Sequence, residues 1–296
     1  MRDPFFLDKF IEFYRQNKIE TDSFIYPFML IDYNGLKSMS SLGYQGPLWK
    51  REPGMLEVEE FFSSRMDFIH KNNIVCEFIR FNPFLENHIP LKGLFNIQES
   101  SSFYVIDVKS SPEEYLSSLP NRTRAILSKH LKDTAIISKS VGLLESALKY
   151  KNEFFYDINS LTSLVKSDFA VQMTYLVNDF EVASSLFFVS DYSAYYIANS
   201  SSEKGKQYGA NAIIIYNFYK YAFNKGFKHI GLGGGINEND SLSLFKKQFA
   251  NSILKTNHLK LIHNEEIYYK ANKNKRERFF PPYLENTNLL KLRVSH

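Results

Sequence analysis

A run of three glycines at the end of an apolar segment is the feature that most constrains this chain. Residues 227–232 have the pattern of a buried strand, and Gly233–Gly235 follow directly. Residues 241–250 then have the apolar spacing of a short helix that carries Lys246. A strand end without side chains lets a ligand approach the backbone, and a lysine on the next helix can face that ligand. The segment therefore predicts a ligand site at the end of a strand.

The elements around the glycines have a readable order. Residues 181–189 and 194–199 predict a hairpin that turns at Ser190 and Asp191. After a polar loop at 200–209, residues 210–225 predict a helix that Gly226 ends, and 252–262 predict a strand. The order β-β-α-β-α-β predicts a mixed sheet with helices packed on it, an α/β (α+β) fold.

The N-terminal half alternates in the same way, and 296 residues suffice for two subdomains. Its apolar patterns predict strands at 24–32, 74–81, 103–108 and 134–138, and helices at 57–71, after Ser111, at 121–132, around 141–155 and at 160–178. We place the boundary near residue 109, which gives subdomains of residues 1–108 and 109–296.

Composition excludes several classes of protein. The net charge is +4, from 36 basic and 32 acidic residues. This excess is smaller than nucleic-acid-binding proteins usually have, but it suits a small phosphate-bearing ligand. The single cysteine, Cys76, excludes an internal disulfide and a thiolate metal cluster, and we expect it to pack in the core. No two histidines have metal-ligand spacing, so we expect no metal.

The chain has no apolar run of about 18 residues and no signal peptide at its N-terminus. We therefore expect a cytoplasmic protein, which can still act on lipid-linked material at the inner membrane face. Three common motifs are missing. Residues 231–236 mimic a dinucleotide fingerprint but end in isoleucine, and the sequence contains neither a phosphate-binding loop ending in Gly-Lys-Ser/Thr nor a Gly-x-Ser-x-Gly elbow.

Several short motifs occur in a fixed order between residues 44 and 249. They are Tyr44-Gln45-Gly46-Pro47-Leu48, Ile79-Arg80-Phe81-Asn82-Pro83, residues 122–129, Tyr195-Tyr196, residues 203–212, Gly233-Gly234-Gly235 and Phe245-Lys246. In this order they resemble the FemAB-type branch of the GNAT acyltransferase fold, whose members have two GNAT-like subdomains and include peptidoglycan-bridge aminoacyltransferases. The resemblance implies an acyltransferase.

This chain also departs from the family. Asn82 stands where the family often has an acid, which removes a carboxylate that could position or deprotonate the acceptor amine; we keep Asn82 as a substrate-binding candidate. The long helical arm of some bridge-forming members is missing, which favours acyl-CoA over aminoacyl-tRNA as the donor. The GNAT phosphate loop survives only loosely, at residues 207–212. The general base stays unassigned.

A loop that enters a helix presents free N–H groups to an anion, so the segment before residue 212 is the candidate phosphate site. The alternative is a solvated loop with two lysines. The residues expected to bind the cofactor, here and at the glycine run, are Lys206, Gln207, Gly209, Ala210, Asn211, Gly233 and Gly234.

For catalysis, the resemblance assigns Lys246 to the negative charge of the tetrahedral intermediate. The apolar spacing places Leu242, Phe245 and Phe249 on the buried face of the helix, with Lys246 beside it. Tyr195 and Tyr196 point to opposite faces of their strand, so only one can face a cleft, and Tyr208 is a further candidate proton donor. For each of these side chains the alternative is an ordinary structural or solvated role.

A basic helix supplies the remaining substrate-binding candidates. Arg122 and Lys129 are seven residues apart and share a helix face, whereas Arg124 does not. They can bind a diphosphate on the acceptor, or they can form a solvated basic face. Phe245 is a further candidate, although a core position is the alternative.

These observations predict an N-acyltransferase that moves an acyl group from acyl-CoA (acetyl-CoA) to an amino sugar, nucleotide- or lipid-linked, for cell-surface polysaccharide. With no cysteine or activated serine in place, we expect direct attack by the amine. One alternative keeps the fold and uses aminoacyl-tRNA to build a peptidoglycan bridge, which would make tRNA a partner. Another is a non-catalytic module that binds nucleotide-sugars or glycans.

Overall fold

The computed structural model describes residues 3–130, 135–138, 140–144, 158–235, 240–273 and 280–284. Its contacts divide the chain into two compact units. The first comprises Ser101–Leu254 together with the segment that ends at Leu7, and the second comprises Asp8–Ser100 and the chain from Lys255 on. The units are thus interleaved along the sequence, whereas the domains predicted on either side of residue 109 are continuous ranges. That single boundary stays a prediction.

The sheet of the first unit has the strand order β6-β11-β10-β9-β8-β7. Its strands are β6 (Gln98–Asp107), β7 (Ile136–Ser138), β8 (Ala170–Val177), β9 (Phe180–Val189), β10 (Ser193–Ser201) and β11 (His229–Gly233). Neighbouring strands are antiparallel except β10 and β11, which are parallel. Parallel strands need a crossover connection, and the chain supplies it with helix α8 (Ala210–Lys225).

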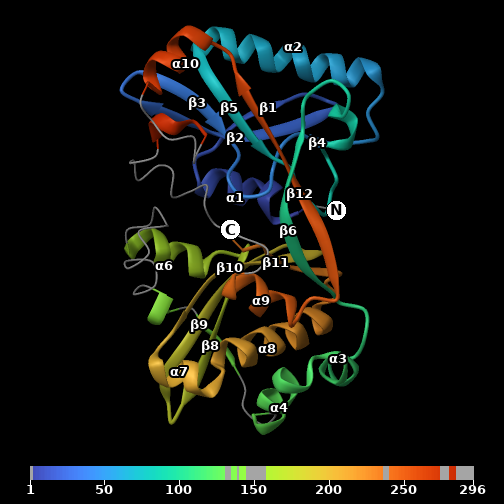
Figure 1. Cartoon of the computed structure of the whole chain (residues 1–296), viewed down its shortest axis with the longest axis vertical. Coiled ribbons are helices and arrows are strands. Elements are labelled where there is room, and N and C mark those ends of the chain that lie inside the picture. Colours follow the sequence, from blue (N-terminus) through green and yellow to red (C-terminus); the bar gives the residue numbers. More distant parts are fainter. Residues whose placement is uncertain are drawn as a thin grey trace. The chain divides into compact units, whose positions relative to one another are not determined.

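Helix α8 packs on this sheet along most of its length, as Figure 1 shows. Ten of its sixteen residues are buried, and Phe218 stacks on Phe187 of β9 with ring centroids 3.6 Å apart. The helix ends at Gly226, whose φ of +75° favours glycine. The other helices of the unit are η1 (Pro4–Phe6), α3 (Pro112–Ser118), α4 (Asn121–Lys129), α6 (Ile158–Lys166), α7 (Glu203–Tyr208) and α9 (Ser241–Lys247).

The parallel pair separates before either strand ends. The register pairs Ser193 with His229 and ends at Tyr195 and Gly231, although β10 continues to Ser201 and β11 to Gly233. Both strands contain an irregularity just beyond this point, between Tyr196 and Ala198 in β10 and between Gly231 and Gly233 in β11. The carboxyl ends of parallel strands are where ligands commonly bind in α/β folds.

The sheet of the second unit has the order β1-β2-β3-β5-β12, with β4 paired to β2. The strands are β1 (Asn17–Glu20), β2 (Phe24–Tyr33), β3 (Leu36–Ser40), β4 (Leu48–Trp49), β5 (Ile74–Arg80) and β12 (Ser252–Ile262). The helices are α1 (Asp8–Phe13), α2 (Met55–Asn72), η2 (Ile89–Leu91), α10 (Glu265–Ala271) and η3 (Pro282–Leu284). Phe61 of α2 packs against Phe24, Tyr26 and Trp49 in the core of this unit.

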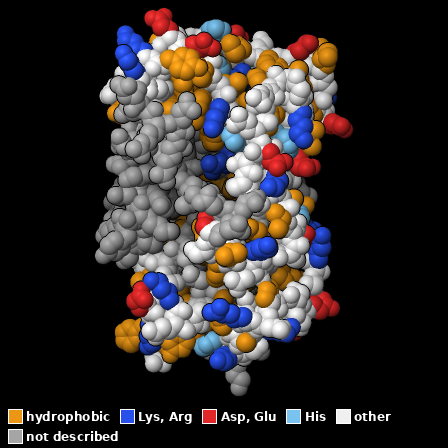
Figure 2. Space-filling model, viewed as in Figure 1, with side chains coloured by type: hydrophobic (Ala, Val, Ile, Leu, Met, Phe, Trp, Pro, Cys, Tyr) orange, Lys and Arg blue, Asp and Glu red, His pale blue; other side chains and the backbone are white. Residues whose placement is uncertain are grey.

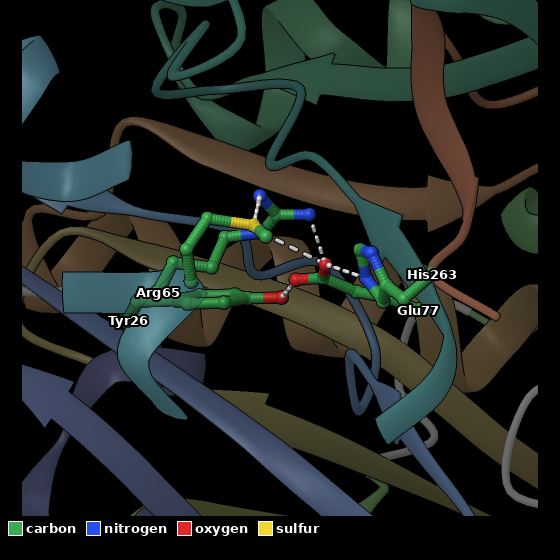
Figure 3. A network of polar contacts seen from close by, with 5 residues as sticks. Tyr26, Arg65, Glu77 and His263 are labelled. Carbon is green, nitrogen blue, oxygen red and sulfur yellow. Dashed lines mark hydrogen bonds and ion pairs between the residues drawn. The ribbon is translucent and has the colours of Figure 1, made fainter. Parts of the chain in front are cut away.

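A buried ionic network crosses that core (Figure 3). The Glu77 carboxylate accepts hydrogen bonds from Arg65, from the Tyr26 hydroxyl at 2.6 Å and from Nε2 of His263 at 3.1 Å. Burial raises the pKa of Glu77, but the charge of Arg65 and the hydrogen bonds from His263, Arg65 and Tyr26 outweigh burial and lower this pKa to about 2. Glu77 is therefore ionised inside the fold at neutral pH.

The structure confirms the α/β fold class and most predicted elements of both halves, including the hairpin around Ser190 and the helix start at Ser111. Two predictions are wrong. The helix expected over 160–178 ends at Lys166, and β8 occupies 170–177; the apolar run fits both periods. The loop expected at 200–209 contains α7, whose first turn is capped by Ser202. Most of the helix expected around 141–155 lies outside the described residues.

Candidate functional site

A pocket of about 380 Å³ lies at the start of α8 in the first unit. It is formed where the end of β10, the junction of α7 and α8, helix α4 and helix α9 meet. Its lining residues are Arg122, Thr123, Ile126, Ser201, Lys206, Gly209, Ala210, Asn211, Ala212, Phe245, Gln248 and Phe249. Six of the predicted site residues are among them, although they come from three separate segments of the sequence.

Gly209 shapes the floor of this pocket. It has a φ of +68°, it ends α7 and it precedes the first residue of α8. A Cβ atom at this position would lie 2.8 Å from Cγ2 of Ile126 on α4. Glycine is therefore required twice, for its left-handed backbone and for the close approach of α4.

The N-terminal end of α8 has the features of an anion-binding site. The first N–H groups of an α-helix lack partners within the helix, and its dipole places positive potential there. Asn211 is fixed beside these groups because its Oδ1 accepts a 2.6 Å hydrogen bond from the Ser201 hydroxyl. Arg122 and Lys206 add two exposed cations to the lining, and Lys206 also contacts Glu203 at 2.5 Å. The pocket therefore suits a phosphate group.

Helices α4 and α9 are joined at the pocket rim. The Thr123 hydroxyl donates a 2.7 Å hydrogen bond to Oε1 of Gln248. Arg124 is held on the other side of α4, where its guanidinium donates to the Ser117 carbonyl at 2.8 Å and to Asn121. Neither Arg124 nor Lys129 lines the pocket, so Arg122 is the member of the predicted basic set that does.

Lys246 lies on the buried face of α9. Its side chain is 3% exposed, and its Nζ donates a 2.5 Å hydrogen bond to the carbonyl oxygen of Gly234. The buried residues of this face are Ser243, Lys246 and Phe249, whereas Leu242 is 38% exposed. The predicted buried face is thus wrong for Leu242, and the lysine lies on that face rather than beside it. Phe245, partly buried, contacts both the pocket and the Phe249 ring.

The glycines after β11 are close to other parts of the protein. A Cβ on Gly234 would lie 2.6 Å from the Ser102 carbonyl oxygen, and one on Gly235 would lie 2.2 Å from the Ser243 hydroxyl. Gly233 has a φ of +76°. Close packing within the unit therefore accounts for these glycines without a ligand. They hold the carbonyl of Gly234 against α9, where Lys246 reaches it.

The two strand tyrosines face opposite sides, as predicted. The buried Tyr195 hydroxyl donates a 2.6 Å hydrogen bond to Asp3, and its ring packs on Phe5. Tyr196 packs on Phe187, and burial raises its pKa, so its hydroxyl stays protonated. Tyr208 packs against the His130 ring. None of the three lines the pocket, and neither does Gln207.

Asn82 belongs to the second unit and has a clear structural role. Its Oδ1 accepts from the backbone N–H groups of Phe84 and Leu85, and its Nδ2 donates to the Tyr44 carbonyl. The side chain is fully buried. These contacts hold the turn after β5, so a substrate role for Asn82 stays a prediction.

The surface of the described residues carries mixed charge. On the face in Figure 2, Lys and Arg side chains are interspersed with Asp and Glu. Within the described part of the chain, no helix is both long and apolar enough to cross a membrane. Over the same ranges, His, Cys, Asp and Glu side chains form no cluster of three that could hold a metal ion.

Comparison with known proteins shows a resemblance to one family over part of the chain. Residues 158–257 match the model of the FemAB family. The predicted resemblance is confirmed. The matched region of this FemAB-like chain runs from α6 into β12 and contains both α8 and Lys246. A comparison of the sequence with curated proteins gives no match.

Solved structures share the fold over most of the chain. A crystal structure of FemX matches with a TM-score of 0.67 and 13% identity, and the match covers 89% of this chain and 93% of that one. The C-terminal domain of a putative lysylphosphatidylglycerol synthetase from Agrobacterium fabrum matches with a TM-score of 0.56 and 12% identity, and the match covers 85% of each chain. The L-PGS structure from Bacillus licheniformis matches with a TM-score of 0.56 and 10% identity, and the match covers 94% of this chain and 88% of that one. At these identities the likeness concerns the fold.

Sequence reasoning missed part of the pocket. Thr123, Gln248 and Ser201 line it, yet nothing in their local pattern marks them. Thr123 and Gln248 are 125 residues apart, and only the docking of α4 on α9 brings their side chains together. The loop that enters an apolar helix at Gly209 was the local signal for this pocket, and it pointed to Lys206, Gly209, Ala210 and Asn211.

Proposed function

We propose that this FemAB-like protein is a cytoplasmic N-acyltransferase that moves an acyl group from acyl-CoA to the amine of an amino sugar destined for the cell surface. The pocket at the start of α8 would bind the diphosphate of coenzyme A. The family match over residues 158–257 supports a transferase, and the acyl-CoA donor and amino-sugar acceptor are the finer parts of the proposal.

The pocket is the observation that carries the donor assignment. Arg122, Lys206 and the first N–H groups of α8 converge there within one unit. Ser201, at the end of β10, lines the same pocket. Beyond Tyr195 and Gly231, β10 and β11 have no registered pairing with each other. An extended, amide-bearing pantetheine arm can occupy such a strand edge, because its amides can form the hydrogen bonds of a missing strand.

Lys246 fits the chemistry that follows. The acceptor nitrogen attacks the thioester carbonyl carbon, the carbonyl oxygen becomes negative, and the C–S bond then breaks to release coenzyme A as the thiol. The amine loses one proton and the sulfur gains one. An ammonium group held by a backbone carbonyl in a buried site can stabilise the oxyanion without reorganising. We assign this role to Lys246, and Tyr196 on β10, whose hydroxyl stays protonated, is kept as a candidate proton donor.

A second donor deserves a direct test because of the fold comparisons. The matches to FemX and to a domain of a putative lysylphosphatidylglycerol synthetase favour an aminoacyl group as the transferred unit. Under this alternative the donor is aminoacyl-tRNA, and the cations at the pocket bind the phosphates of its acceptor end. With this donor the amine must still lose a proton, and the negative charge on the carbonyl oxygen must still be stabilised.

Donor binding distinguishes the two. We expect coenzyme A to raise the midpoint of thermal unfolding, and the shift to shrink when Arg122 is changed to Gln. If tRNA binds instead, with an affinity that falls steeply with salt, the aminoacyl donor is supported. The reaction is then read by mass spectrometry after incubation with acetyl-CoA and a panel of nucleotide-linked amino sugars. Acceptor binding without consumption of either donor would indicate a non-catalytic binding module and would overturn the proposal.

A further inference from the structure

The pocket at the start of α8 contains a glutamine whose amide is held in one orientation. Gln248 follows the last residue of α9, and its Oε1 accepts a 2.7 Å hydrogen bond from the Thr123 hydroxyl on α4. Its Nε2 donates to the Leu244 carbonyl oxygen at 3.4 Å. A flipped amide would turn its own oxygen toward that carbonyl oxygen, and two acceptors repel each other. The two contacts therefore fix which side of the amide is the donor and which is the acceptor.

These contacts use only part of the amide. A side-chain amide has two N–H groups and two lone pairs on its oxygen, and Leu244 and Thr123 occupy one of each. Among the described residues, no other hydrogen bond is formed by this side chain. Gln248 is exposed and lines the pocket. Its amide therefore has one donor and one acceptor, side by side, for a ligand.

An apolar surface lies next to this amide. Phe245 is three residues before Gln248, so the two side chains are neighbours on the surface of α9, and both line the pocket. The Phe245 ring is partly buried and packs on Phe249, with ring centroids 5.2 Å apart and an interplanar angle of 61°. Ile126 of α4 adds apolar surface to the lining. A planar ring in the pocket can therefore stack on Phe245 and place its edge at the amide.

The charged part of the pocket adjoins the same residues. Arg122 precedes Thr123 in α4, and Lys206 and the first N–H groups of α8 complete the positive lining. A nucleotide has both a planar ring with a polar edge and a phosphate. Adenine presents the N6 donor beside the N7 acceptor, whereas guanine presents two acceptors, O6 and N7. An amide of fixed orientation, with one donor and one acceptor, matches adenine and not guanine.

We propose that Gln248, held by Thr123, recognises the adenine base of the donor, with Phe245 stacked on the base and Arg122 and Lys206 at its phosphates. The Gln248 Oε1 accepts from N6 of the base, and its Nε2 donates to N7. This inference rests on the proposed function, because it takes this pocket as the donor site. Coenzyme A and the 3′ end of aminoacyl-tRNA both contain adenosine, so the contact is the same for either candidate donor.

The test uses the full-length protein and calorimetric titration with three probes, ADP, GDP and inorganic pyrophosphate. We expect ADP to bind at least about tenfold more tightly than GDP, which is the discrimination that a bidentate amide contact gives. Gln248→Leu keeps a similar volume, so it should lower the affinity for ADP to that for GDP and leave pyrophosphate binding unchanged. Equal binding of ADP and GDP by the unchanged protein, or an ADP preference that Gln248→Leu retains, overturns the proposal.

Thr123 gives a second variant of unchanged shape. Thr123→Val removes the hydroxyl and frees the amide to rotate, so the preference for ADP should fall about threefold, and Thr123→Ser should retain it. Gln98→Leu is the control, because Gln98 is an exposed glutamine that does not line the pocket, and it should keep the full preference. An ADP preference that Thr123→Val leaves unchanged would show that Thr123 does not position the amide.

Two further ligands identify the source of the adenine. Gln248→Leu should weaken coenzyme A if that is the donor, and it should weaken an RNA hairpin with a 3′-terminal CCA if aminoacyl-tRNA is the donor. An ADP preference that depends on Gln248, with no binding of coenzyme A or the hairpin, would overturn the proposed function and support the adenine site. Pyrophosphate binding that depends on Arg122, without any ADP preference, would overturn the adenine contact and support the donor pocket.

Discussion

The ammonium group of Lys246 donates a 2.5 Å hydrogen bond to the carbonyl oxygen of Gly234, and the lysine side chain is 3% exposed. A short helix and the glycine run after β11 are thereby joined by a charged side chain. Burying a charge is costly, and a fold keeps such a group only when it is hydrogen-bonded. The hydrogen bond to Gly234 satisfies this buried group, and a role for Lys246 in the reaction is a proposal that mutation can test.

Replacing Lys246 with Met should lower turnover far more than it lowers donor affinity. Methionine fills a similar volume but removes the charge, and loss of one oxyanion donor costs roughly 100- to 1,000-fold in kcat. The measurement is kcat and KM for acyl transfer, together with the dissociation constant of coenzyme A.

Lys247→Met is the matched control, because Lys247 is the next residue of α9 and is exposed. Its activity should equal that of the unchanged protein. Equal turnover in the two variants would remove Lys246 from the reaction. A loss of donor affinity with unchanged kcat would instead assign Lys246 to binding.

Gly209→Ala should destabilise the protein more than Gly226→Ala does. Both glycines have a left-handed backbone, with φ of +68° and +75°, and this costs alanine about 1–2 kcal/mol at either position. A Cβ at Gly209 also meets Ile126 at 2.8 Å, whereas nothing lies within 4 Å at Gly226. We expect an additional cost of about 1 kcal/mol or more, measured by chemical denaturation.

The extra cost at Gly209 should depend on Ile126. In an Ile126→Ala background the two glycine variants should become similar, since the steric contact is gone and only the backbone strain remains. If the difference between Gly209→Ala and Gly226→Ala persists in that background, α4 does not pack against α8 as described.

Arg122→Gln and Lys206→Gln should each weaken coenzyme A binding by roughly three- to tenfold, because each removes one charged contact to phosphate at an exposed site. The affinity of the unchanged protein should fall with salt, and less steeply in either variant. Calorimetric titration at two salt concentrations measures both effects. Arg124→Gln is the control, because Arg124 is bound to Ser117 and Asn121 and does not line the pocket. An equal loss in all three variants would indicate a general charge effect and no defined phosphate site.

Glu77→Gln should destabilise the second unit by about 3–5 kcal/mol, because it leaves the buried Arg65 charge without its carboxylate. The change Glu57→Gln, at a surface pair with Arg51 where the side chain also accepts from the Gly54 N–H at the start of α2, should cost about 1 kcal/mol or less. Urea denaturation with a probe in the second unit makes the comparison.

The same network sets a pH dependence. The pKa of Glu77 is lowered from 4.5 to about 2 in the fold, so its contribution is fully present above pH 4.5. It is lost as the pH falls from 4.5 through 2, because the unfolded chain takes up the proton first. Stability of the unchanged protein should fall over this window, and the fall should be smaller in Glu77→Gln. Parallel curves for the two proteins would contradict an ionised Glu77.

Most of the secondary structure could be predicted from the sequence, because the spacing of apolar residues that is typical of a helix or of a strand is a local feature of the chain. Ser111 and Gly226 mark a helix start and end by their own chemistry, and the turn residues Ser190 and Asp191 between two strand-like segments mark the hairpin of β9 and β10. The failures have the same cause. Residues 170–177 are apolar apart from Gln172 and Thr174, and such a segment fits a buried strand as well as a helix, so only pairing with β9 selects the strand.

By itself, then, the sequence determined the α/β class, the order of the elements, the family resemblance and the presence of Lys246 after a glycine run. The tertiary structure decided which residues meet. It separated the pocket at Gly209 from the contact between Lys246 and Gly234, and it placed Asn82 in a turn. It also brought together Thr123 and Gln248. Side-chain contacts between distant segments depend on strand register and helix docking, and no local pattern encodes either one.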